Sequence, residues 1–178
     1  MPRINDDGRL TADQIVLSCL RLFQEILEYI LAQTRAASEE VDLSRVFEAG
    51  LGEMGYHADH SDWEDLSQEE QAAWIRVVDT VGKQIEGAVD LSWQELAKSA
   101  FLHHQICLQK THADFTHLPP TLQLLWETIA RHLANLLVFD ITEDGAISVH
   151  EQRIMDWFKV KFEERIGPAL QVLSKERL

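Results

Sequence analysis

The sequence has few of the residues that interrupt or cross-link a chain: four prolines, eight glycines and two cysteines among 178 residues. Cys19 and Cys107 are too few for a disulfide-stabilised scaffold, and they indicate a reducing compartment. Residues 1–8 contain no apolar segment of the kind that a secretory signal needs. No apolar run approaches the roughly 20 residues of a membrane span. We therefore expect a cytoplasmic protein that does not cross a membrane.

Positive charge is also scarce. Lysine and arginine number 16 against 30 aspartates and glutamates, which gives a formal net charge of −14. Such a surface repels the phosphates of nucleic acids and of anionic membranes, whereas it suits metal cations and basic proteins. We therefore expect no nucleic-acid partner. Hydrophobic residues make up 46% of the chain, which is enough to build a packed core.

Apolar residues recur at helical spacing along most of the chain, and most clearly in residues 11–34. Ser67 with Glu70 and Ser92 with Glu95 have the spacing of capping boxes at helix starts. No stretch of strict apolar–polar alternation predicts a long strand. The sequence therefore predicts an all-α fold of about six to eight helices. The helices expected are 11–34, 43–54, 67–82, 92–109, 121–139 and 149–166, with a short seventh after them.

Two short motifs, Val-Asp-Leu-Ser and His-Ala-Asp, each occur twice. The copies begin at Val41 and Val89 and at His57 and His112. We expect one domain over 1–178, and the repeated motifs are consistent with duplicated halves of about 1–83 and 84–178. Matches of three or four residues also arise by chance, so an unduplicated domain stays open.

One segment has the composition of a metal-binding loop: residues 140–151 read DITEDGAISVHE. Oxygen-bearing side chains stand at its positions 1, 3, 5, 9 and 12. Calcium prefers about six to eight oxygens, and a short chain surrounds it only if alternate residues point inward and the chain turns sharply midway. Gly145 allows this turn because it lacks a Cβ. The candidate ligands are Asp140, Thr142, Asp144, the carbonyl of Ala146, Ser148 and Glu151.

This segment resembles the EF-hand, a helix–loop–helix calcium site. Phe139 and Met155 fit the apolar pattern of EF-hand helices, whereas His132 stands where that pattern has an apolar residue. The resemblance implies an EF-hand-like helical domain that binds Ca²⁺, with Glu151 giving two oxygens. Thr142 replaces the usual aspartate or asparagine, which leaves three carboxylates and lowers the expected affinity.

EF-hands normally occur in pairs, so the resemblance implies a partner loop. Residues 3–14 look like a second loop, but Arg3 in its first ligand position and Gln14 in its last would prevent calcium binding. Segments 59–70 and 84–95 keep fewer of the pattern's residues. If all four are hands, the layout resembles the sarcoplasmic calcium-binding type with a single working site. If not, these segments are turns and capped helix starts.

Segment 140–151 also has an explanation without metal. An Asp-Gly turn followed by a helix, with Ser148 as its N-cap and Glu151 three residues on, is itself a capping box. That explanation does not account for Asp140 and Asp144, which precede it four residues apart. The metal-binding explanation predicts a calcium buffer or a calcium-dependent switch with a protein partner. The metal-free explanation predicts a helical scaffold or a protein-interaction module.

No catalytic motif stands out. Residues 103–107 place two histidines and a cysteine at a spacing that zinc tolerates, but in an apolar helix such a cysteine is usually a core residue. His150 and Glu151 begin like a metalloprotease motif, yet Ile154 stands in place of the second histidine. The sequence has no phosphate loop, no dinucleotide fingerprint and no Gly-x-Ser-x-Gly. We therefore expect a protein that is not an enzyme.

Overall fold

The structure is a computed structural model that describes residues 12–37, 63–87, 92–108, 114–138 and 144–169. In this part of the chain all regular structure is helical, so the predicted all-α fold is confirmed. None of the helices described here has both the length and the apolarity that crossing a bilayer requires. The elements are α1 (Ala12–Ala37), η1 (Trp63–Asp65), α3 (Gln68–Gly87), α4 (Trp93–Cys107), η2 (Phe115–His117), α5 (Pro120–Val138) and α6 (Asp144–Arg165).

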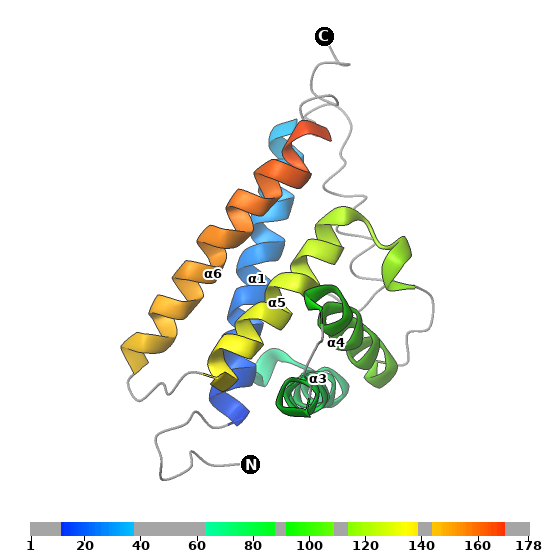
Figure 1. Ribbon diagram of the computed structural model, residues 1–178, viewed down its shortest axis with the longest axis vertical. Helices are drawn as coiled ribbons and strands as arrows, with labels where there is room; N and C mark the ends of the chain where they lie inside the picture. The colour runs from blue at the N-terminus through cyan, green and yellow to red at the C-terminus, as the bar shows by residue number, and fades with distance from the viewer. Residues whose placement is uncertain (1–11, 38–62, 88–91, 109–113, 139–143, 170–178) are drawn as a thin grey trace.

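Helix α5 lies at the centre and packs against all four other long helices. In Figure 1, α1 and α6 run in the same direction along the long axis, and α5 runs back against them. Helices α3 and α4 pack against each other, and α4 also packs on α5. The buried residues of α5 lie on nearly every side of the helix, as expected for a helix that is surrounded by others.

Aromatic rings fill the core where α1, α3, α4 and α5 meet. The ring of Trp126 stacks on Trp74 with 5.9 Å between centroids and 27° between planes. Phe23 and His104 lie against the same indole at 5.8 Å and 5.2 Å. Trp74 and Trp126 are therefore both part of the buried core. Trp93 is partly buried and packs against the core from the start of α4.

A short structural unit occurs twice in this core. In each copy a 3-10 helix is followed by a buried leucine, and a buried tryptophan lies on the next α-helix. The leucine and tryptophan are Leu66 and Trp74 in one copy and Leu118 and Trp126 in the other, with the same spacing. The two tryptophans stack on each other, so the copies meet at matching positions. The division of the chain into duplicated halves stays a prediction.

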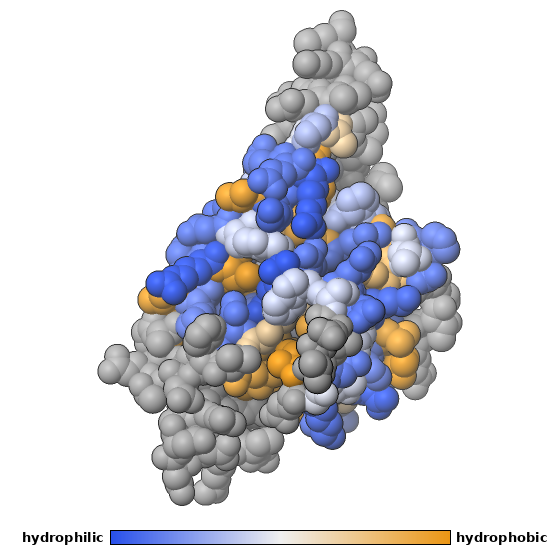
Figure 2. Space-filling model, viewed as in Figure 1, coloured by the Kyte–Doolittle hydropathy of each residue, from blue (hydrophilic) through white to orange (hydrophobic). Residues whose placement is uncertain are grey.

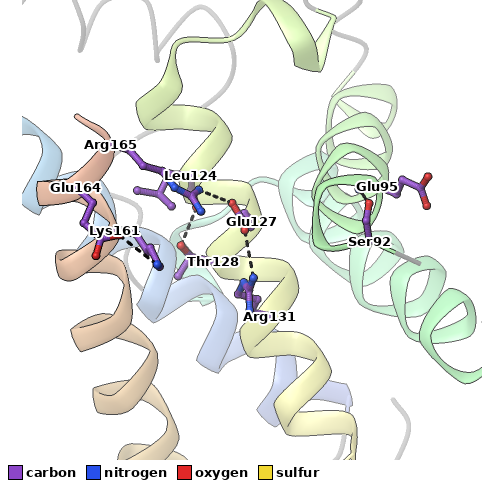
Figure 3. A network of polar contacts seen from close by, with 9 residues as sticks. All are labelled: Ser92, Glu95, Leu124, Glu127, Thr128, Arg131, Lys161, Glu164 and Arg165. Carbon is purple, nitrogen blue, oxygen red and sulfur yellow. Dashed lines mark hydrogen bonds and ion pairs between the residues drawn. The ribbon is translucent and has the colours of Figure 1, made fainter. Parts of the chain in front are cut away.

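The helix starts that capping boxes predicted are confirmed. Ser67 Oγ accepts a hydrogen bond from the backbone nitrogen of Glu70, and Ser92 Oγ accepts one from that of Glu95, both at 3.1 Å. Figure 3 shows Ser92 at the start of α4 with Glu95 beyond it. Each hydroxyl satisfies one of the donors that a helix leaves free at its first turn. The predicted helix 43–54 and the loop 3–14 lie outside the described residues, except for the first residues of α1.

Candidate functional site

The structure describes only part of segment 140–151. Asp140 and Thr142 lie outside the described residues, and the other four candidate ligands lie on α6. Ser148 is exposed. Glu151 is partly buried, with 17% of its side chain exposed, and its carboxylate reaches α1. Of the candidate ligands whose side chains the structure describes, Glu151 is the one that contacts another helix.

Helix α6 begins at Asp144, five residues before the predicted start at 149. Successive residues of an α-helix rotate by about 100°, so alternate residues do not converge on one point as they do in a calcium loop. Binding through all six residues would require 144–147 to leave the helix, and Ile147 is buried. The metal-free explanation changes as well: Ser148 lies inside α6, so its assignment as the N-cap is wrong.

Glu151 Oε2 accepts two hydrogen bonds from α1. Ser18 Oγ donates one and Arg21 Nε donates the other, both at 3.1 Å. Ser18 is completely buried, whereas 53% of the Arg21 side chain is exposed. The carboxylate thus lies at the edge of the core, between a buried hydroxyl and a cation at the surface. Charge-assisted bonds of this kind are stronger than bonds between neutral groups.

The same serine connects α1 to α5. Ser18 Oγ lies 2.7 Å from Nε2 of His132, which is also completely buried. The single hydroxyl proton of Ser18 goes to Glu151, so His132 must donate from Nε2 to Ser18 Oγ. The other ring nitrogen of His132, Nδ1, then carries no proton. Nδ1 is buried and has no hydrogen-bond partner. Burial, and to a smaller extent the charges of His150 and Arg21, lower the pKa of His132 from 6.5 to about 4, so the imidazole is neutral.

We call Ser18, Arg21, His132 and Glu151 the polar junction. It joins α1, α5 and α6, but it is not a serine–histidine–acid catalytic site. In such a site the acid orients the imidazole, whereas here Glu151 contacts the serine, and the serine is buried. The adjacent Cys19 is equally inert as a nucleophile, because burial and then the charge of Glu151 raise the pKa of its thiol to about 12.

Segment 140–151 fits calcium in the chemistry of its side chains but only partly in the conformation of its backbone. Ser148 and Glu151 are oxygen donors, and Glu151 Oε2 already holds one cationic group, the guanidinium of Arg21. In the part of the chain that the structure describes, no three histidines, cysteines, aspartates or glutamates are grouped as a metal site requires. A complete ligand set therefore depends on Asp140 and Thr142 and on unwinding the first turn of α6.

Comparison of the chain with protein-family models, curated proteins and solved structures finds no match. The EF-hand resemblance of 140–151 stays a prediction, and it rests on the pattern of residues in the loop. The structure adds the partners of Glu151 and the position at which α6 begins.

The loop pattern predicts Glu151 as a site residue, whereas no motif in the sequence predicts its partners Ser18 and Arg21. Ser18 carried a signal: it lies three residues after Ile15 and four before Leu22, within the apolar stripe of the first helix. A polar residue in such a stripe is buried and needs a partner. Arg21 has no such signal in the sequence, because its contact with Glu151 depends on which face of α6 meets α1.

A second cluster joins α4, α5 and α6. The guanidinium of Arg131 lies between two indoles, 4.6 Å from the ring centroid of Trp93 and 4.5 Å from that of Trp157. Glu127 Oε1 pairs with Arg131 at 3.4 Å, and its Oε2 accepts from Arg165 at 2.9 Å, as Figure 3 shows. No pattern in the sequence indicates this arrangement, because its residues come from three different helices.

The histidines and the cysteine of 103–107 do not form a common site in the described structure. His103 accepts a hydrogen bond from Arg76 Nε at 3.3 Å. His104 lies in the aromatic core, where burial lowers its pKa from 6.5 to about 3. Two neighbouring imidazoles therefore contact different parts of the molecule, and Cys107 is a free, partly buried thiol.

Proposed function

We propose that the chain is a calcium-binding protein whose ligands come from segment 140–151, and that Glu151 links this site to the helical core. The observation that supports it is the position of Glu151: a carboxylate at the last ligand position already holds a cation, Arg21. Bound calcium would supply a fixed double positive charge for these oxygens. The residues to hold it are Asp140, Thr142, Asp144, the carbonyl of Ala146, Ser148 and Glu151.

The chain's own residues set the cost of this binding. Glu151 must give up its bonds to Ser18 and Arg21, and residues 144–147 must leave the helix, which exposes Ile147. Gly145 lowers this cost, because glycine is about 1 kcal/mol less favourable than alanine inside a helix. With three carboxylates and this cost, we expect an affinity below that of tight calcium buffers.

Thermal unfolding in EDTA, in millimolar calcium and in magnesium tests the proposal. A ligand that binds only the native state stabilises it by about 2.7 kcal/mol at a hundredfold excess over Kd, which is an easily measured shift of the midpoint. We expect this shift in calcium for the wild-type chain and for the control Glu163→Gln, which alters an exposed carboxylate on the same helix. We expect no shift for Glu151→Gln.

Gly145→Ala tests whether calcium binding needs the loop to form, because it changes the preference of the backbone and leaves the charge of the ligands unchanged. Because alanine favours the helical state of 144–147, this variant should unfold at a higher temperature than the wild-type chain in EDTA. It should also lose much of the shift in calcium, since the sharp turn and the unwinding both become harder. A wild-type chain with the same midpoint in EDTA and in calcium would reject the proposal.

The second candidate function is a metal-free helical scaffold or protein-interaction module. Two observations favour it: Glu151 is satisfied by α1 without a metal, and Leu102 and Ile106 are exposed one turn apart on α4. Figure 2 shows small apolar patches among hydrophilic residues on one face of the molecule. Either function is non-enzymatic. The free thiols of Cys19 and Cys107 support a cytoplasmic location.

A further inference from the structure

Glu151 is the only candidate ligand whose described contacts reach α1. Its Oε2 accepts from Ser18 on the buried side and from Arg21 on the exposed side. Both donors lie within one turn of α1, so a single carboxylate oxygen holds this turn against the first third of α6. The same carboxylate is the one that a calcium loop uses at its twelfth position, with both of its oxygens.

Resting on the proposed function, we infer that Arg21 and Ser18 compete with calcium for Glu151, so that the first half of α1 is the element that responds to the metal. The carboxylate that contributes both oxygens to a metal cannot keep Oε2 between a hydroxyl and a guanidinium. Calcium binding and the contact between α1 and α6 both use the carboxylate of Glu151, so the two equilibria are linked, and each affects the other equally. Contacts with α1 therefore weaken calcium binding, and calcium weakens the contact between α1 and α6.

The expected change is local. Ser18 keeps its 2.7 Å bond to His132, so α1 stays attached to α5 when Glu151 leaves. Farther along α1, the Tyr29 ring packs edge-on against Phe158 and Phe162 of α6, at 5.7 Å and 5.2 Å between centroids. These apolar contacts do not involve Glu151. The separation of α1 from α6 is therefore confined to the turn that carries Ser18 and Arg21.

Titration calorimetry with calcium chloride tests the competition. Arg21→Met removes the donor and keeps an apolar stem, and it should tighten calcium binding by about two- to fivefold, since pairs at the surface are weak. Arg153→Met is the matched control: it removes the same charge from an exposed position two residues after Glu151. It should change Kd by a clearly smaller factor, because it acts only through solvent.

The outcomes separate the two proposals. Tighter binding by Arg21→Met than by Arg153→Met supports the competition. Equal effects of the two variants would overturn it and leave calcium binding in place. A wild-type chain that binds no calcium would overturn the proposed function and this inference together.

A second measurement needs no calcium. In EDTA, Arg21→Met and Glu151→Gln should together destabilise the chain by less than the sum of their separate effects, because each breaks the same contact. Additive effects in urea unfolding would show that Arg21 does not hold Glu151, and would remove the basis of the competition.

Discussion

Ser18 Oγ of α1 lies 2.7 Å from His132 Nε2 of α5, in a position where both side chains are completely buried. This bond joins two helices that are far apart in the sequence, and it places a polar contact within the buried core. Buried polar groups of this kind cost free energy unless they are paired, so each partner needs the other. The pairing fixes which faces of α1 and α5 meet.

Replacing Ser18 should therefore destabilise the fold. Ser18→Ala leaves the Nε2–H of His132 without an acceptor and removes one donor to Glu151. We expect a loss of about 1–3 kcal/mol in the free energy of unfolding, measured in urea. Ser99→Ala, on the partly exposed side of α4, should change it by less than about 0.5 kcal/mol. Equal losses of unfolding free energy in Ser18→Ala and Ser99→Ala would contradict the buried hydrogen bond between Ser18 and His132.

Buried histidines should make the fold sensitive to acid. The pKa of His104 is lowered from 6.5 to about 3, and that of His132 to about 4, both chiefly by burial. Between these values and about 6.5 the unfolded chain binds protons that the native chain does not, so stability falls as the pH falls. Each histidine contributes about 1.4 kcal/mol per pH unit in this window. Urea unfolding between pH 7 and pH 5 measures the slope.

His104→Phe tests the assignment of that slope, because it keeps an aromatic ring against Trp74 and Trp126 but cannot bind a proton. The slope should fall by about 1.4 kcal/mol per pH unit in the middle of the window. His117→Asn removes an exposed imidazole instead of a buried one and is the matched control; its slope should stay steeper than that of His104→Phe. An unchanged slope in His104→Phe would show that His104 is not buried as described.

The cluster around Arg131 should hold the start of α4 to α6. Arg131→Met keeps roughly the volume of the side chain but loses two cation–π contacts and one of the two arginines paired with Glu127. We expect a loss of about 1–2 kcal/mol and a change in tryptophan fluorescence from Trp93 and Trp157. Arg153→Met, which is exposed on α6, should show neither effect. If both variants behave alike, the indoles do not hold the guanidinium.

One glycine offers a stabilising substitution. Gly82 lies inside α3, where a Cβ would meet only Leu137 Cδ1, at the ordinary contact distance of 3.4 Å. Gly82→Ala should raise the free energy of unfolding by about 0.5–1 kcal/mol, because alanine restricts the unfolded chain and favours the helix. A destabilised variant would mean that α3 and α5 approach each other more closely than the structure has them.

Local signals in the sequence predicted the fold class and several helix starts. Ser67 and Ser92 determine where α3 and α4 begin through bonds to residues three positions on, and such bonds depend on neighbours in the sequence alone. The start of α6 was not predicted, because nothing in the local pattern showed that Ile147 is buried. The partners of Glu151 were missed for a related reason: they depend on how two distant helices are oriented.

The most direct test is equilibrium dialysis of the wild-type chain and Glu151→Gln against calcium, with the bound metal measured by atomic absorption. At about 1 mM free calcium, the proposed site predicts close to one ion per wild-type chain and much less in Glu151→Gln. Glu163→Gln should bind as the wild-type chain does. No bound calcium in the wild-type chain, or equal amounts in the wild-type chain and Glu151→Gln, would contradict a calcium site at 140–151.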